Sequence, residues 1–326
     1  MTTTRYAKLA GTALTFTMIV IVWGAYVRAS GSGAGCGNQW PLCKGGIWSI
    51  ETFIELTHRA TSGIALLLTV AMLVFGFRTF PRRHRVRIGA TLSMVFMITE
   101  ALVGAGLVLF ELVAHDASVA RGLFMSVHLI NTFILLAVMT LTAYWAAGGS
   151  SVKFRGQGTI LWIFAASFLG TLLLGVSGAV AALSDTLFPA SSLSEGFAQD
   201  FSHAGSIFLR LRLLHPILAV AVGLLLIAAA FFARQLRPNQ TTRNLSLILP
   251  SIVAVQLVAG LANVLLLTPI WLQLIHLVLA DLVWIALVLL CSSALSLTLK
   301  NSAAAMSESI PSVGAAGLQI GTARQR

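Results

Sequence analysis

The sequence predicts an all-α integral membrane protein whose eight transmembrane helices form two four-helix bundles. Three observations predict this class. Of the 326 residues, 57% are hydrophobic and 10% are charged, whereas a soluble domain has about 25% charged residues. The hydrophobic residues gather in long uninterrupted stretches, and the two halves of the chain resemble each other.

Eight stretches are long and apolar enough for a bilayer, which takes about 20 residues per helix. Because small residues follow the first stretch, this stretch could instead be a cleaved signal peptide. The length of the stretch and the presence of a counterpart in the second half favour a retained transmembrane helix. We place the stretches at 9–28, 55–77, 88–110, 122–146, 159–182, 209–233, 245–267 and 271–297.

The net charge of +11, from 21 basic and 10 acidic residues, is unevenly distributed. Most Lys and Arg residues lie before the first stretch, in every second loop and after the last stretch. By the positive-inside rule these segments face the cytoplasm, so both termini are expected there, in a multi-pass protein of the cell membrane. No segment outside the stretches is long enough for a nucleic-acid-binding domain, and residues 300–326 read as a disordered cytoplasmic tail.

An internal repeat divides the chain into two halves, 1–150 and 151–299. The sequence GAYVRAS at 24–30 aligns with GAVAALS at 178–184, and LVGAG at 102–106 aligns with LVAGL at 257–261. Each half contains four stretches, an even number, so both halves have the same orientation. We therefore expect them to be related by an axis along the membrane normal.

Four histidines occupy matching places, each a few residues inside the outer end of an even-numbered stretch. At 1.5 Å per residue they lie on the order of 5 to 10 Å below the outer surface. A single membrane histidine is often only a hydrogen-bond partner between helices, but a matched set indicates ligands. The four are His58 and His128 in the first half and His215 and His276 in the second.

Two imidazoles on facing helices can bind a flat haem between them. Zinc or copper could also use two histidines, but no carboxylate or cysteine set completes either site. The sequence thus predicts one haem site per half, toward the outer face. Nearby Arg59, Arg210 and Arg212 are candidate partners of haem propionates, with membrane-interface anchoring as the alternative.

The halves differ near the first histidine of each. Glu55 lies one turn before His58. A structural interpretation is an acidic residue that the helix dipole favours at a helix start. A functional interpretation is a proton acceptor or a group that positions the substrate. Cys36 and Cys43 occur only in the first outer loop, where a disulfide staple and a redox role both stay open. Cys291, inside the last stretch, reads as a core residue.

These residues closely resemble the haem A synthase family. Residues 31–43 read GSGAGCGNQWPLC and residues 55–59 read ELTHR; DTLFP at 185–189 and RLRLLHP at 210–216 also match the family. The resemblance covers about residues 8 to 298.

The resemblance implies an oxidoreductase that converts haem O to haem A, by oxidising a ring methyl to a formyl group, for cytochrome oxidase. It implies haem b on His215 and His276, substrate haem O on His58 and His128, catalytic Glu55, and a Cys36–Cys43 disulfide. It also implies partners: haem O synthase, oxidase assembly factors and an electron donor or acceptor. The second cysteine pair of some members is missing here.

Three other classes compete with this interpretation. A bis-haem transmembrane b-type cytochrome, acting only as an electron carrier or reductase, explains four paired histidines but not the single Glu55. A two-repeat transporter would require broken helices near the midplane, which the sequence does not show. An assembly factor without catalysis is the third.

Overall fold

A computed structural model describes residues 1–43, 49–202, 206–237 and 239–296. The predicted cytoplasmic tail, 300–326, lies outside these described residues.

The described residues contain eight helical spans long and apolar enough to cross a membrane, as predicted. The short α7 and the longer α8 together form one of these spans. A 3-10 turn, η1, and a short helix, α6, lie in the two long loops. The elements are α1 (Thr3–Ala29), η1 (Ser32–Ala34), α2 (Ile50–Thr79), α3 (Arg85–Leu109), α4 (Val119–Ala146), α5 (Thr159–Leu187), α6 (Leu193–Asp200), α7 (Ile207–Arg212), α8 (Leu214–Leu236), α9 (Gln240–Leu265) and α10 (Ile270–Ala294).

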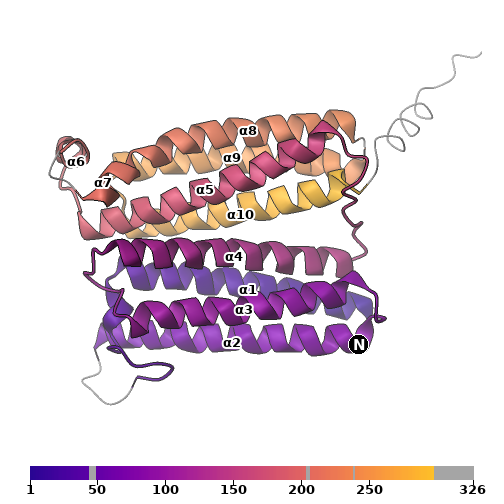
Figure 1. The fold of residues 1–326 in the computed structure, drawn as a ribbon, viewed down its shortest axis with the longest axis horizontal. Coiled ribbons are helices and arrows are strands. Elements are labelled where there is room, and N and C mark those ends of the chain that lie inside the picture. Colours follow the sequence, from indigo (N-terminus) through magenta and orange to yellow (C-terminus); the bar gives the residue numbers. More distant parts are fainter. Residues whose placement is uncertain (44–48, 203–205, 238, 297–326) are drawn as a thin grey trace, which may run out of the picture.

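The spanning helices are arranged in two groups (Figure 1). The first group contains α1 to α4, and the second contains α5, the α7–α8 span, α9 and α10. In the first group α1 packs against α2 and α4, and α3 packs against the same two helices. In the second group α8 packs between α5 and α9, and α10 packs against α9. The groups meet where α4 contacts α5 and α10, and where α1 contacts α10.

Polar caps start several helices outside the apolar stretches that the sequence shows. Ser49 accepts a hydrogen bond from the Thr52 N–H at 3.2 Å, so α2 begins at Ile50 and not near residue 55. Such caps satisfy backbone groups that the first helical turn leaves unpaired. As a result Glu55 lies in the second turn, where the helix dipole has largely fallen off, and the helix-start interpretation of this residue loses its basis.

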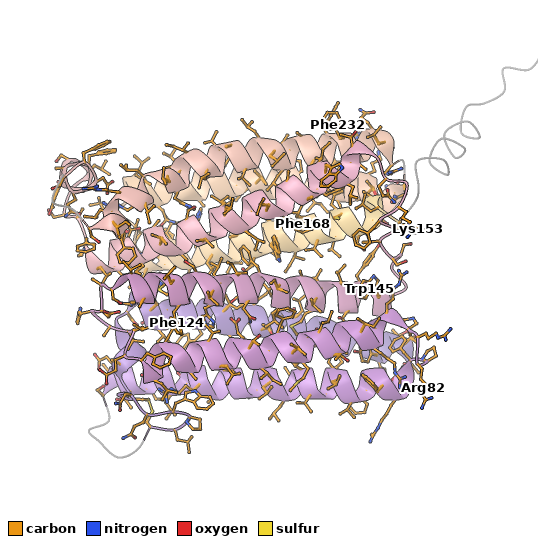
Figure 2. The ribbon with its side chains drawn as sticks, in the orientation of Figure 1. Arg82, Phe124, Trp145, Lys153, Phe168 and Phe232 are labelled. Atoms are coloured by element: carbon orange, nitrogen blue, oxygen red, sulfur yellow. A yellow bond between two sulfur atoms is a disulfide. The ribbon has the colours of Figure 1, made fainter. Side chains whose placement is uncertain are left out.

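Aromatic packing joins the two groups at their centre. The rings of Phe133 in α4 and Trp284 in α10 are stacked with centroids 4.8 Å apart, and Trp284 Nε1 donates to the Phe133 carbonyl oxygen at 2.7 Å. Phe168 of α5, labelled in Figure 2, meets Trp284 edge to face with ring centroids 5.3 Å apart. The indole therefore satisfies its polar atom while its ring fills the seam between the groups.

Candidate functional site

The four predicted histidines lie near one end of the molecule, the end that carries η1, α6 and α7 (Figure 1). Their helices all start at this end. His58 is on α2, His128 on α4, His215 near the start of α8, and His276 on α10.

Each of the four imidazoles lies against a glycine of the preceding long helix. The absence of a side chain lets the ring approach the neighbouring backbone. A Cβ placed on these glycines would lie within van der Waals distance of the ring, or closer, in all four cases. The distances from that Cβ to Cε1 are 2.9 Å for Gly24 and His58, 3.7 Å for Gly104 and His128, 3.0 Å for Gly178 and His215, and 3.1 Å for Gly260 and His276.

The pair in the second group has the spacing of two ligands on one metal. The ring centroids of His215 and His276 are 6.4 Å apart. Bonds from a metal to imidazole nitrogen are about 2 Å long, so two axial imidazoles on one iron have centroids about 6 Å apart. Ser177 Oγ lies 3.0 Å from His215 Nδ1, and His276 Nδ1 is buried without a hydrogen-bond partner among the described residues. These two side chains fit a bis-histidine haem.

In the first group, His128 has a carboxylate as its neighbour. Glu100 Oε1 is 3.5 Å from His128 Nδ1, within ion-pair distance but without hydrogen-bond geometry. The Glu100 carboxylate also accepts hydrogen bonds from Asn131 Nδ2 and Thr132 Oγ1, both at 2.5 Å. Glu100 is thereby held beside the imidazole.

Gln256 occupies the matching place in the second group. It precedes Gly260 by four residues on α9, as Glu100 precedes Gly104 on α3. Gln256 Nε2 lies 3.2 Å from His276 Nε2. One histidine pair thus has a carboxylate as neighbour and the other a neutral amide. Sequence analysis missed this contrast, although the shared spacing to the glycine could have revealed it.

Glu55 holds the first outer loop against the His58 helix. Its side chain is only 3% exposed. Glu55 Oε2 accepts the Cys36 backbone N–H at 2.8 Å, and Oε1 pairs with the guanidinium of Arg59. Thr52 Oγ1 adds a hydrogen bond to the Gly35 carbonyl oxygen at 2.6 Å. Both carboxylate oxygens are therefore engaged within one turn of His58.

Arg59 extends this network into the loop, because its Nη1 donates to the carbonyl oxygens of Gln39 at 2.6 Å and Pro41 at 3.2 Å. The structure contains a disulfide between Cys36 and Cys43, which closes the same loop. Cys291 is half-buried and unpaired. The loop motif, the acid and the first histidine thus form one connected unit.

The arginines near the second pair differ in their surroundings. Arg212 donates to Asp185 at 2.9 Å through Nη1 and to Asp200 at 2.5 Å through Nη2. Its guanidinium is therefore already ion-paired to two carboxylates. Arg210, at the end of α7, is exposed. Contact of either residue with a haem propionate stays a prediction.

Arg28 links the two groups, a role that sequence analysis did not assign. Its Nη1 donates to the Ala182 carbonyl oxygen at 2.7 Å and to Thr186 Oγ1 at 2.6 Å, and its Nη2 donates to Gln273 Oε1 at 3.1 Å. Ala182 is the residue aligned with Arg28 in the predicted repeat. A contact between two aligned residues is expected where a pseudo-twofold axis passes between the halves.

The fold and these side chains define a class: a multi-pass helical membrane protein with two histidine pairs near one end. Residues 48–288 match the COX15-CtaA family model, described as cytochrome oxidase assembly protein, and the chain belongs to this family, which includes the haem A synthases. The resemblance seen in the sequence is confirmed.

Several curated proteins are similar to this chain. A Thermus thermophilus protein named protoheme IX farnesyltransferase is 46% identical over 302 residues, covering 90% of this chain and 50% of the relative. A Bacillus licheniformis protein named heme A synthase is 28% identical over 235 residues, covering 68% of this chain and 74% of the relative. A Bacillus cereus heme A synthase is 31% identical over 164 residues, covering 48% and 53%. The chain spans about half the length of the Thermus relative.

Proposed function

We propose that this protein is a haem A synthase, which oxidises a ring methyl of haem O to a formyl group. His215 and His276 would hold a resident haem b, and His58 and His128 would hold the substrate haem. The observation that carries the proposal is the set of four imidazoles, two in each helix group and each against a glycine, with the rings of His215 and His276 6.4 Å apart. In each pair the protein offers two nitrogens, and a porphyrin supplies the other ligands of the iron.

The surroundings of the first pair support its assignment as the reactive one. Oxidising a methyl group releases protons, and a carboxylate within one turn of the axial ligand can accept them. Glu55 is such a group, whereas Arg212 stands at the aligned position of the second half. When bound, the haem supplies the redox chemistry; the chain orients it, excludes water and takes up protons.

The expected topology predicts on which side of the cell membrane the histidines lie. With both termini in the cytoplasm, the histidine end faces outward. The name of the Thermus relative refers to farnesylation of protoheme IX, which supports a haem-farnesylating enzyme, haem O synthase, as the partner that supplies substrate. Cytochrome oxidase assembly factors would receive the product. The reaction also takes up one oxygen atom: with water as its source, R–CH3 + H2O gives R–CHO + 4 H+ + 4 e−, and an electron acceptor is required, whereas monooxygenation with O2 as its source requires an electron donor.

A bis-haem electron carrier is the second candidate, and the two histidine pairs are the observation in its favour. Expression in cells that make haem O but no haem A separates the two. The synthase produces haem A, identified by mass in the extracted pigments. An electron carrier binds haem but leaves haem O unchanged, even with its redox supply intact.

Gly24→Ala is expected to lower haem A formation about tenfold or more. The new Cβ would lie 2.9 Å from His58 Cε1, which forces the ring away, and displacement of a catalytic group by about 1 Å can cost 100-fold in rate. Gly11→Ala on the same helix is the control, because a Cβ there meets nothing within 4 Å. Haem A yield per mole of purified protein is the measurement. Equal yields from both variants would contradict the role of the glycine.

Glu100 and Gln256 are expected to influence the properties of the haem at the histidine that each one neighbours. A carboxylate next to an imidazole strengthens its donation to iron and stabilises the oxidised state. Glu100→Gln should lower haem A formation on the order of 10- to 100-fold. Gln256→Glu should move the reduction potential of the resident haem to a more negative value, as measured by a redox titration. An unchanged potential would contradict this account.

A further inference from the structure

A cavity of about 590 Å³ lies at the end of the molecule opposite the histidines. We call it the basic cavity and define it by six of its lining residues: Arg83, Arg85, Trp145, Ser150, Ser151 and Lys153. Figure 2 shows Trp145 and Lys153 at this end. None of the residues that line this cavity has a role in the proposed haem sites.

Uncompensated positive charge distinguishes this cavity. Arg83, Arg85 and Lys153 form no ion pair with the described residues, and no acidic side chain is among the residues that line it. Like charges around one cavity repel each other, and an anion in their midst removes the repulsion.

Neutral donors add to this charge. Trp145 Nε1 is buried and has no hydrogen-bond partner among the described residues. The hydroxyl groups of Ser150 and Ser151 also line the cavity. Helix α3 begins here, and its first turn contains no acidic residue that would offset the positive end of the helix dipole. Such a combination of cations and hydrogen-bond donors suits the oxygens of a phosphate group.

The position of the cavity along the helices indicates where the phosphate comes from. Helix α2 ends at Thr79, α3 starts at Arg85, and α4 ends at Ala146, so the cavity lies where the apolar spans stop. Tryptophan at this level is typical of the headgroup region of a bilayer. Basic cavities between transmembrane helices at this depth accommodate anionic lipid headgroups.

The walls come from both helix groups. The turn between α2 and α3 and the end of α4 belong to the first group. The linker that carries Lys153 is tied to the second group, because the Lys153 N–H donates to the Leu295 carbonyl oxygen at 2.9 Å and Ser292 Oγ donates to the Ser150 carbonyl oxygen at 3.3 Å. An occupant would bridge the two groups.

We propose that the basic cavity binds the phosphate headgroup of an anionic phospholipid and thereby holds the two helix groups together. The site is separate from the histidine pairs, so it stands whether or not the protein makes haem A.

Lipid binding by the purified full-length protein in neutral detergent tests the proposal. The probe is dioleoylphosphatidylglycerol, with dioleoylphosphatidylcholine as the uncharged comparison, and native mass spectrometry gives the Kd. The triple variant Arg83→Gln/Arg85→Gln/Lys153→Gln should weaken phosphatidylglycerol binding on the order of 100-fold. Each basic residue near an anionic headgroup contributes about 1 kcal/mol, and three of them correspond to a change in Kd of about this size. Arg78→Gln/Arg155→Gln/Arg243→Gln removes the same charge from exposed positions outside the cavity, and its Kd should stay within about threefold.

Two further measurements test the hydrogen-bond donor and the identity of the ligand. Trp145→Phe removes the indole N–H, keeps an aromatic ring at this position and should weaken phosphatidylglycerol binding severalfold. Glycerol 3-phosphate at matched concentration should raise the Tm less than the lipid does. An equal rise would overturn the lipid as the occupant, and equal losses of binding in the two triple variants would overturn the site itself.

Discussion

Glu55→Ala is expected to abolish haem A formation, with a loss of about 100-fold or more, the usual contribution of a positioned acid or base. The carboxylate is buried one turn from His58, where it binds the Cys36 N–H at 2.8 Å and the guanidinium of Arg59. Its loss removes a proton acceptor one turn from His58 and leaves the half-buried Arg59 without its carboxylate partner. Pigments extracted from cells that supply haem O give the measurement.

A matched variant separates the chemistry of Glu55 from its hold on the loop. Thr52→Val removes the hydrogen bond to the Gly35 carbonyl oxygen, another anchor of the same loop, and leaves the carboxylate in place. We expect it to keep most of the haem A yield. If Thr52→Val lost as much as Glu55→Ala, loop placement would account for the whole effect, and Glu55 would be a positioning residue.

His276→Ala is expected to remove the resident haem and with it haem A formation. Its ring lies 6.4 Å from that of His215, and the substitution would remove one of the two side chains that would hold the haem iron. The reduced-minus-oxidised spectrum per mole of purified protein measures this loss.

His115→Ala is the control for His276→Ala. His115 is exposed in the loop between α3 and α4, at the same end of the molecule. Its replacement should leave the spectrum unchanged. A normal haem spectrum in His276→Ala would contradict the proposed ligand pair.

Hydrophobic stretches predict the eight spans because a helix needs about 20 predominantly apolar residues to cross a bilayer. The ends are less predictable, since caps such as Ser49 lie in polar sequence beyond the stretch. The short α6 follows the same rule: its N-cap Ser192 accepts from the Glu195 N–H at 3.2 Å, and no long apolar stretch announces it.

The histidines can be found from the sequence because imidazoles are rare in membrane spans and recur at matching places. Their neighbours are harder to find. Arg28 reaches Ala182 across 154 residues of sequence, and Glu100 acquires its place beside His128 only when α3 packs on α4. Contacts between helices depend on packing, which a single sequence does not display.

The identity of the haems bound to two histidine variants tests the division of labour between the helix groups most directly. His58→Ala and His215→Ala are each purified from cells that make both protoheme and haem O, and the extracted haems are identified by mass. We predict that His58→Ala retains protoheme and lacks haem O and haem A, and that His215→Ala shows the reverse. Equal loss of protoheme from both variants would contradict the assignment of the two sites.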